Sequence, residues 1–96
     1  MLFVIHALDK LGALPTRQAN YDAHKAFLGT CEADFGVRMV MSGPLVGDDG
    51  TTMIGSFLLM ESPDRASVER FNKADPFYKA GIWATVAINA FVRRVG

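Results

Sequence analysis

The 96-residue sequence has few of the residues on which metal, redox and nucleic-acid functions depend. Its single cysteine, Cys31, cannot form an internal disulfide, which favours a reducing cytoplasm. Two histidines and one cysteine, without metal-ligand spacing, predict no metal site. Ten basic and ten acidic residues give zero formal net charge, and Arg93-Arg94 forms the main basic cluster. This balance argues against a nucleic-acid partner.

Long apolar runs are also missing. The apolar segment at 2–8 is short and lacks the basic leader of a signal peptide, and no segment approaches the ~20 apolar residues that cross a membrane. The acidic turn Gly47-Asp48-Asp49-Gly50 has no following lysine and is therefore no phosphate-binding loop. We expect one soluble cytoplasmic domain over residues 1–96, without a cofactor or a membrane partner.

Half of the residues are hydrophobic, and their spacing predicts six main elements. They are strands at residues 2–8, 37–46, 52–61 and 83–95, and helices at 16–34 and 62–73, with a short turn or helical piece at 76–80. We expect Thr16 and Ser62 to cap the helices and Gly36 to end the first one. Gly43-Pro44 requires an edge, a bulge or an early stop in the second strand. The element order predicts a ferredoxin-like α+β sandwich, with both helices on one face of an antiparallel sheet.

Both faces of this sheet are apolar. On the first strand Phe3 and Ile5 point to one face and Val4 to the other, and on the last strand Trp83 is expected to share a face with Phe91. Two helices can cover only one face, and a soluble monomer rarely exposes so large an apolar patch. We therefore predict a homodimer that packs sheet against sheet. The alternative is that loops or the C-terminal end cover the second face.

His24 is the most informative residue, because it recurs at helical spacing with Phe27, Leu28, Cys31 and Phe35 and should point inward. Asp75 lies far away in sequence, before Pro76. If the fold joins the two, the carboxylate can orient the imidazole and tune its basicity for proton transfer. The alternatives are a core histidine satisfied by one hydrogen bond and an aspartate that only caps a helical turn through Tyr78.

Other polar residues are candidates for the wall of a pocket. Arg17, at the opening of the first helix, is either a clamp for a substrate anion or a solvated cation. Ser42 and Ser56, in the middle strands, are either pocket groups or ordinary strand residues, and the Gly43-Pro44 turn would shape the same pocket.

The remaining unusual side chains have structural interpretations. His6, a lone histidine on the second sheet face, is assigned to the dimer interface. Cys31 is expected in the core, as are the strand methionines. These methionines are Met39, Met41, Met53 and Met60.

Several short motifs occur in a fairly specific order and spacing. They are Met1-Leu2-Phe3-Val4-Ile5, Asp9-Lys10, Arg17, His24, Leu28, Ser42-Gly43-Pro44-Leu45, Gly55-Ser56, Asp75-Pro76-Phe77 and Ala80-Gly81. Together they resemble the YCII-related, or YciI-like, family over nearly the whole chain. The resemblance implies a ferredoxin-like fold that dimerises through its sheets, and an active site around a histidine–aspartate pair, which maps to His24 and Asp75. It also implies a link to chemistry, because one branch of the family dehydrochlorinates a chlorinated hydroxyquinol. Tyr21 stands where some relatives carry a second basic residue, which argues against a doubly cationic anion clamp.

The first hypothesis for function is a small cofactor-independent enzyme that performs elimination or isomerisation on a small, anionic or aromatic metabolite. His24 would take or give the proton, Asp75 would orient the imidazole of His24, and Arg17 would hold an anionic group. The second is a non-catalytic dimer that binds a small ligand in the same pocket. A third is a structural subunit of a larger assembly.

Overall fold

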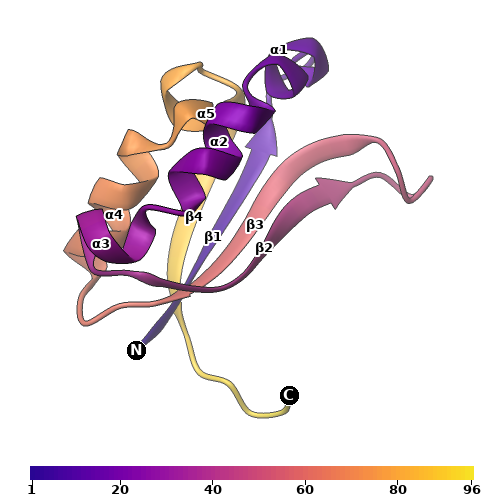
Figure 1. Ribbon diagram of the computed structural model, residues 1–96. Coiled ribbons are helices and arrows are strands. Elements are labelled where there is room, and N and C mark those ends of the chain that lie inside the picture. The colour runs from indigo at the N-terminus through magenta and orange to yellow at the C-terminus, as the bar shows by residue number, and fades with distance from the viewer.

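The structure, a computed structural model that describes residues 1–96, places helices on one face of a four-stranded antiparallel sheet (Figure 1). The strands lie in the order β2-β3-β1-β4. The elements are β1 (Leu2–Asp9), α1 (Leu14–Ala19), α2 (Tyr21–Leu28), α3 (Cys31–Phe35), β2 (Arg38–Val46), β3 (Met53–Glu61), α4 (Arg65–Ala74), α5 (Pro76–Lys79) and β4 (Trp83–Phe91). This arrangement confirms the predicted ferredoxin-like α+β sandwich. None of the helices is long and apolar enough to cross a lipid bilayer.

The main core lies between the central strands and the helices. Ile5 of β1 pairs with Leu58 of β3 on one side and with Ile88 of β4 on the other. These side chains point to the same face because directly paired residues share a face of the sheet. The buried residues of this core are Phe3, Ile5, Cys31, Val37, Leu58, Met60, Val68 and Phe71. The core position predicted for Cys31 is therefore confirmed.

The first crossover consists of three short helices rather than the single helix predicted at 16–34. Its first break is at Asn20, whose side chain donates back to the carbonyl of Thr16 at 2.9 Å. Its second break is at Gly29 and Thr30, where the Thr30 hydroxyl donates to the carbonyl of Phe27. Such local side-chain bonds to the backbone compete with a continuous helix. Thr16 lies inside α1 and caps nothing, whereas Gly36 ends α3 with a positive φ, as expected.

The cap of the second crossover also differs from the prediction. Asp64, and not Ser62, is the N-cap of α4, because its carboxylate accepts from the backbone N–H of Ser67 at 2.8 Å. This bond holds the pKa of Asp64 below its ordinary value. Ser62 instead closes the preceding turn by donating to the carbonyl of Asp64. The chain therefore enters α4 two residues later than the sequence suggested.

Two strands, β2 and β4, depart from regular strand pairing. Pro44 lies in β2, which is an edge strand, so its missing N–H breaks no central ladder. On β4 the pairing with β1 shifts between Leu8 and Asp9, which leaves one extra residue of β4, Ala84, between Trp83 and Thr85. This bulge turns Trp83 toward Phe77 on the helical side, so its predicted alternation with Phe91 is wrong.

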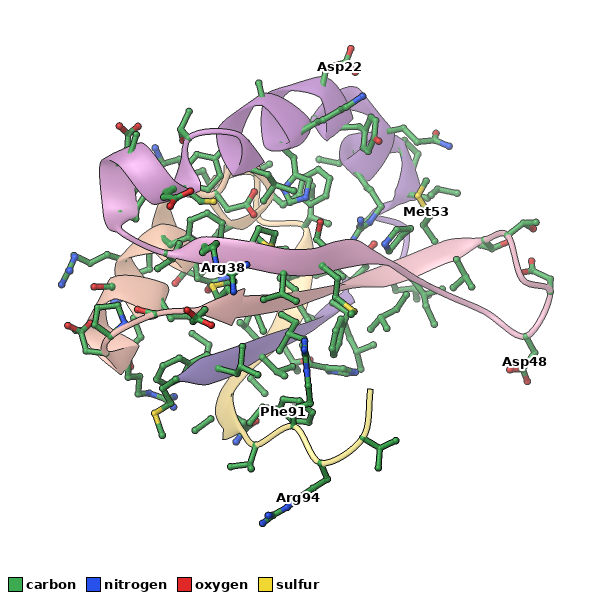
Figure 2. The ribbon with its side chains drawn as sticks, turned by 60° about the horizontal axis from the view of Figure 1, so that its bottom comes forward. Asp22, Arg38, Asp48, Met53, Phe91 and Arg94 are labelled. Carbon is green, nitrogen blue, oxygen red and sulfur yellow. The ribbon has the colours of Figure 1, made fainter.

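The face of the sheet away from the helices is partly open. In Figure 2 the helices lie above the sheet and the C-terminal segment after Phe91 lies below it. That segment was predicted as strand to residue 95, but β4 ends at Phe91. Together with the open face it borders a groove of about 460 Å³, lined by Val4, Met41, Phe57, Leu59, Phe91, Arg93, Val95 and Gly96. The C-terminal end thus covers part of the face.

The methionines do not form the common core that was predicted for them. Met60 is fully buried in the main core, but Met41 is 54% exposed on the open face. Met53 is partly buried and lines a cavity on the helical side of the sheet. Strand periodicity alone could not separate these environments, because both faces of the sheet carry apolar side chains.

Candidate active site

A cavity of about 310 Å³ opens between the first helices and the β2–β3 half of the sheet. It is lined by Arg17, Tyr21, His24, Lys25, Leu28, Ser42, Gly43, Pro44, Met53, Ser56, Leu58 and Phe77. The cavity therefore gathers six of the seven residues that the sequence analysis named for a site. The seventh, Asp75, lies behind the cavity wall against His24.

The His24–Asp75 contact exists in the structure. His24 Nδ1 lies 2.8 Å from Asp75 Oδ1, although the residues are 51 positions apart. The two side chains are only 10% and 1% exposed. Because an ionised carboxylate can only accept, Nδ1 carries the proton of this bond. The other ring nitrogen, Nε2, is then available for a molecule in the cavity.

An aromatic ring fixes the plane of the imidazole. Phe77 stacks on His24 with ring centroids 3.9 Å apart and an interplanar angle of 3°. The guanidinium carbon of Arg17 lies over the same ring, 4.7 Å from its centroid. Trp83 packs edge-on against Phe77 at 6.1 Å. Phe77 was not assigned to the site from the sequence, although it follows Asp75-Pro76 directly.

Asp75 both binds the imidazole of His24 and caps α5, and it uses the same oxygen for both. Oδ1 accepts from His24 and also from the backbone N–H of Phe77 at 2.9 Å, which caps α5. The cap therefore runs through the backbone N–H of Phe77 rather than that of Tyr78. Asp75 Oδ2 is buried without a protein partner, as are Asn72 Nδ2 and Trp83 Nε1. Two bonds to Oδ1 orient the carboxylate toward the imidazole.

Arg17 is neither solvated nor free. It is 3% exposed, and its Nε and Nη2 donate to the two carboxylate oxygens of Asp9 at 2.7 and 2.8 Å. Nη2 also donates to Ser56 Oγ at 2.8 Å. The interpretation of Arg17 as a solvated cation is wrong, and its charge is largely compensated by Asp9. Ser56 is accordingly a buried polar group of the cavity wall rather than an ordinary strand residue.

Lys25 is the charged residue of the cavity that sequence reasoning missed. It is exposed and lies within 4 Å of no carboxylate. Tyr21, Lys25 and Leu28 are spaced by four and three residues, so this second stripe beside His24 was visible in the sequence. The cavity therefore contains a second basic side chain, Lys25, beside the Arg17 whose charge Asp9 compensates.

The outer wall of the cavity is formed by β2. Ser42, Gly43 and Pro44 are exposed there, and Pro44 pairs with Ser56 across the sheet. No three histidine, cysteine, aspartate or glutamate side chains converge as a metal site would require. What the cavity offers is an imidazole held by a carboxylate, an ion pair that contacts a hydroxyl, and a free ammonium.

A glycine next to Ser56 determines how closely β3 approaches β1. A Cβ on Gly55 would lie 2.3 Å from the carbonyl oxygen of Ala7, so no larger residue fits without moving a strand. We expect Gly55→Ala to lower the free energy of unfolding by about 1–3 kcal/mol, the usual cost of overpacking, in a denaturant titration. Gly43→Ala is the matched control, because nothing lies within 4 Å of a Cβ there. Equal stability of the two variants would contradict the proposal that β3 approaches β1 too closely at Gly55 for a larger residue.

Comparison with known proteins places this geometry in a family. A family model described as the YCII-related domain matches residues 1–92. The chain is 30% identical to Protein YciI of Escherichia coli O6:H1 (strain CFT073) and of Shigella flexneri, in each case over 95% of this chain and 96% of the relative. A solved structure of 5-chloro-2-hydroxyhydroquinone dehydrochlorinase (TftG) from Burkholderia phenoliruptrix AC1100, in complex with 2,5-dihydroxybenzoquinone, is 36% identical, with a TM-score of 0.85 over 98% of this chain and 96% of that one. The chain therefore belongs to the YCII-related domain family.

Proposed function

We propose that this protein is a small cofactor-independent enzyme that uses His24 and Asp75 for acid–base chemistry on a small, anionic or aromatic metabolite. The observation that carries the proposal is the buried 2.8 Å contact between the two side chains at the wall of a cavity. The volume of about 310 Å³ suits a ligand of the size of one substituted ring. Elimination or isomerisation is the reaction class that such a pair can perform.

In this proposal His24 Nε2 takes a proton from the substrate, and Asp75 holds the imidazole and stabilises its charged form. The stack on Phe77 keeps Nε2 aimed in one direction. The similarity to TftG supports this class, because that protein is named as a dehydrochlorinase and is bound to a quinone. Its identity of 36% extends over nearly the full length of both chains.

Lys25, rather than Arg17, is proposed as the contact for an anionic group of the substrate. Arg17 already gives two hydrogen bonds to Asp9, whereas Lys25 has no carboxylate partner. A free ammonium at the mouth of a small cavity attracts anions and orients them by charge rather than by fixed geometry. Ser42, Gly43 and Pro44 would border the same ligand from β2.

The proposal is tested by incubating the purified protein with chlorinated hydroxyquinols, 5-chloro-2-hydroxyhydroquinone among them. Release of chloride and the absorbance of the quinone product are followed together. Turnover above the uncatalysed rate supports the enzyme, and the variants described below assign the residues. If NMR shows that the compounds bind and are recovered unchanged, the protein is the non-catalytic binding module instead.

A second copy of the chain is proposed as the partner of the open sheet face, in the cytoplasm. The support is the set of apolar residues left exposed there, among them Leu8, Met41 and Phe91, which the C-terminal segment does not cover fully. His6 lies on the same face, paired with Phe57 and Ala87. An isologous pair would bury both faces at once.

The dimer is tested with a charge on this face. Met41→Glu would place two carboxylates in an apolar interface, so we expect the mass measured by light scattering to fall from about twice 10.5 kDa to 10.5 kDa. Leu11→Glu adds the same charge to a fully exposed loop residue and should leave the mass unchanged. A wild-type protein that already elutes at 10.5 kDa would show that the open face has no second copy.

A further inference from the structure

The hydroxyl of Ser56 has a proton that no atom of the protein accepts. A serine hydroxyl has one proton to donate and two lone pairs with which to accept. Ser56 Oγ accepts from Arg17 Nη2 at 2.8 Å, and it donates to no group in the structure. Because Ser56 is nearly buried but lines the cavity, the proton is available to a molecule that binds there.

The neighbours of Ser56 make this hydroxyl a better donor than an isolated serine. Arg17 is fixed by two bonds to Asp9 and by its position over the ring of Phe77. A hydroxyl that accepts from a guanidinium is polarised, and the hydrogen bond that it donates is correspondingly stronger. The paired Asp9 keeps Arg17 in place and compensates its charge.

The cavity thus offers a base and a donor together. His24 Nε2 can accept a proton, and Ser56 can donate a hydrogen bond, while Phe77 contacts both the imidazole and the guanidinium. A substrate that uses both groups has an acidic C–H or O–H bond conjugated to a carbonyl oxygen. Enolisable ketones, the keto tautomers of quinols, and hydroxyquinones, each with a leaving group, form this class.

We propose that Ser56 is a catalytic residue that donates a hydrogen bond to the substrate oxygen on which negative charge develops, and that Asp9 and Arg17 position it. This proposal rests on the proposed function of His24. His24 takes the proton, the electron pair of the broken bond moves into the conjugated system, and the carbonyl oxygen becomes an oxyanion that Ser56 stabilises. The electron pair on the oxyanion then returns, the carbonyl re-forms and the leaving group departs as an anion. The proton passes from His24 to water.

The first test compares turnover of the substrate found with the chloride assay. Ser56→Ala should lower kcat by about 10²–10³ with a much smaller change in KM, because the bond matters most in the transition state. Ser56→Thr keeps the hydroxyl and should restore most of the activity. Ser67→Ala is the matched control, because Ser67 on α4 also accepts from an arginine, Arg70, at 3.0 Å but lies outside the cavity. Its kcat should equal that of the wild type.

The second test does not require turnover and uses 2,5-dihydroxybenzoquinone as the probe. We expect Ser56→Ala to weaken its binding, followed by absorbance, by about tenfold or more relative to the wild type and to Ser67→Ala. Equal binding to all three proteins, or no binding to the wild type, would overturn the role of Ser56. The proposed function fails separately, when the His24 variant described below keeps its activity although Ser56 still affects the binding of the probe.

Discussion

Replacing His24 with glutamine is expected to lower kcat by a factor of about 10²–10⁴, which is the usual contribution of a positioned acid–base group. Glutamine can still donate a hydrogen bond to Asp75, so the packing against Phe77 is largely kept. It cannot take up a proton at neutral pH. The measurement is the steady-state rate with the substrate identified by chloride release, together with a thermal melt that confirms folding.

The second histidine provides the control for this experiment. His6 lies on the opposite face of the sheet and contacts no residue of the cavity wall by hydrogen bond. His6→Gln should therefore keep the wild-type kcat. If His24→Gln also retained activity within about threefold, far less than the 10²–10⁴ expected, the acid–base role of the His24–Asp75 pair would be wrong.

Replacing Arg17 with methionine is expected to lower the free energy of unfolding by about 3–5 kcal/mol. Methionine has nearly the length of the arginine stem, but it leaves the carboxylate of Asp9 buried without a partner. The Asp9 side chain is only 7% exposed, so water cannot readily replace the two lost hydrogen bonds. Chemical denaturation measures the change, and the loss should be the largest among single substitutions in the cavity wall.

Two further variants separate a buried charge from a lost contact. The double variant Arg17→Met with Asp9→Leu removes both charges and should recover most of the stability. Arg65→Met breaks the Arg65–Glu69 pair, whose side chains are about half exposed, and should cost less than about 1 kcal/mol. A similar loss in Arg65→Met and Arg17→Met would refute the argument that burial makes the Arg17–Asp9 pair important.

The element order was predictable from the sequence because each strand carries its own apolar run, but details that depend on single contacts were not. The break at Asn20 depends on one side-chain bond to the backbone, which helical periodicity does not record. The orientation of Trp83 depends on a bulge, and one inserted residue reverses the alternation of a strand. The edge position of Pro44, by contrast, is one of the three outcomes that the missing N–H of proline predicted.

The site was predictable to the extent that a residue was unusual for its local environment. His24 stood out as a titratable group in an apolar stripe, and the resemblance to the family linked it to Asp75. Asp9 and Arg17 each look ordinary in sequence. They form an ion pair only because the fold brings the end of β1 next to α1. Lys25 follows His24 directly and was not assigned to the site, although its side chain borders the cavity.

One carboxylate oxygen, Asp75 Oδ1, serves both the imidazole and the first turn of α5. Natural selection for a folded chain alone would then preserve this aspartate, even in a descendant that had lost its reaction. The presence of the acid in a relative consequently indicates little about whether that relative is active. The His24 side chain bonds to Asp75 and not to the backbone, so its loss during evolution would be the clearer sign that a relative no longer performs the reaction.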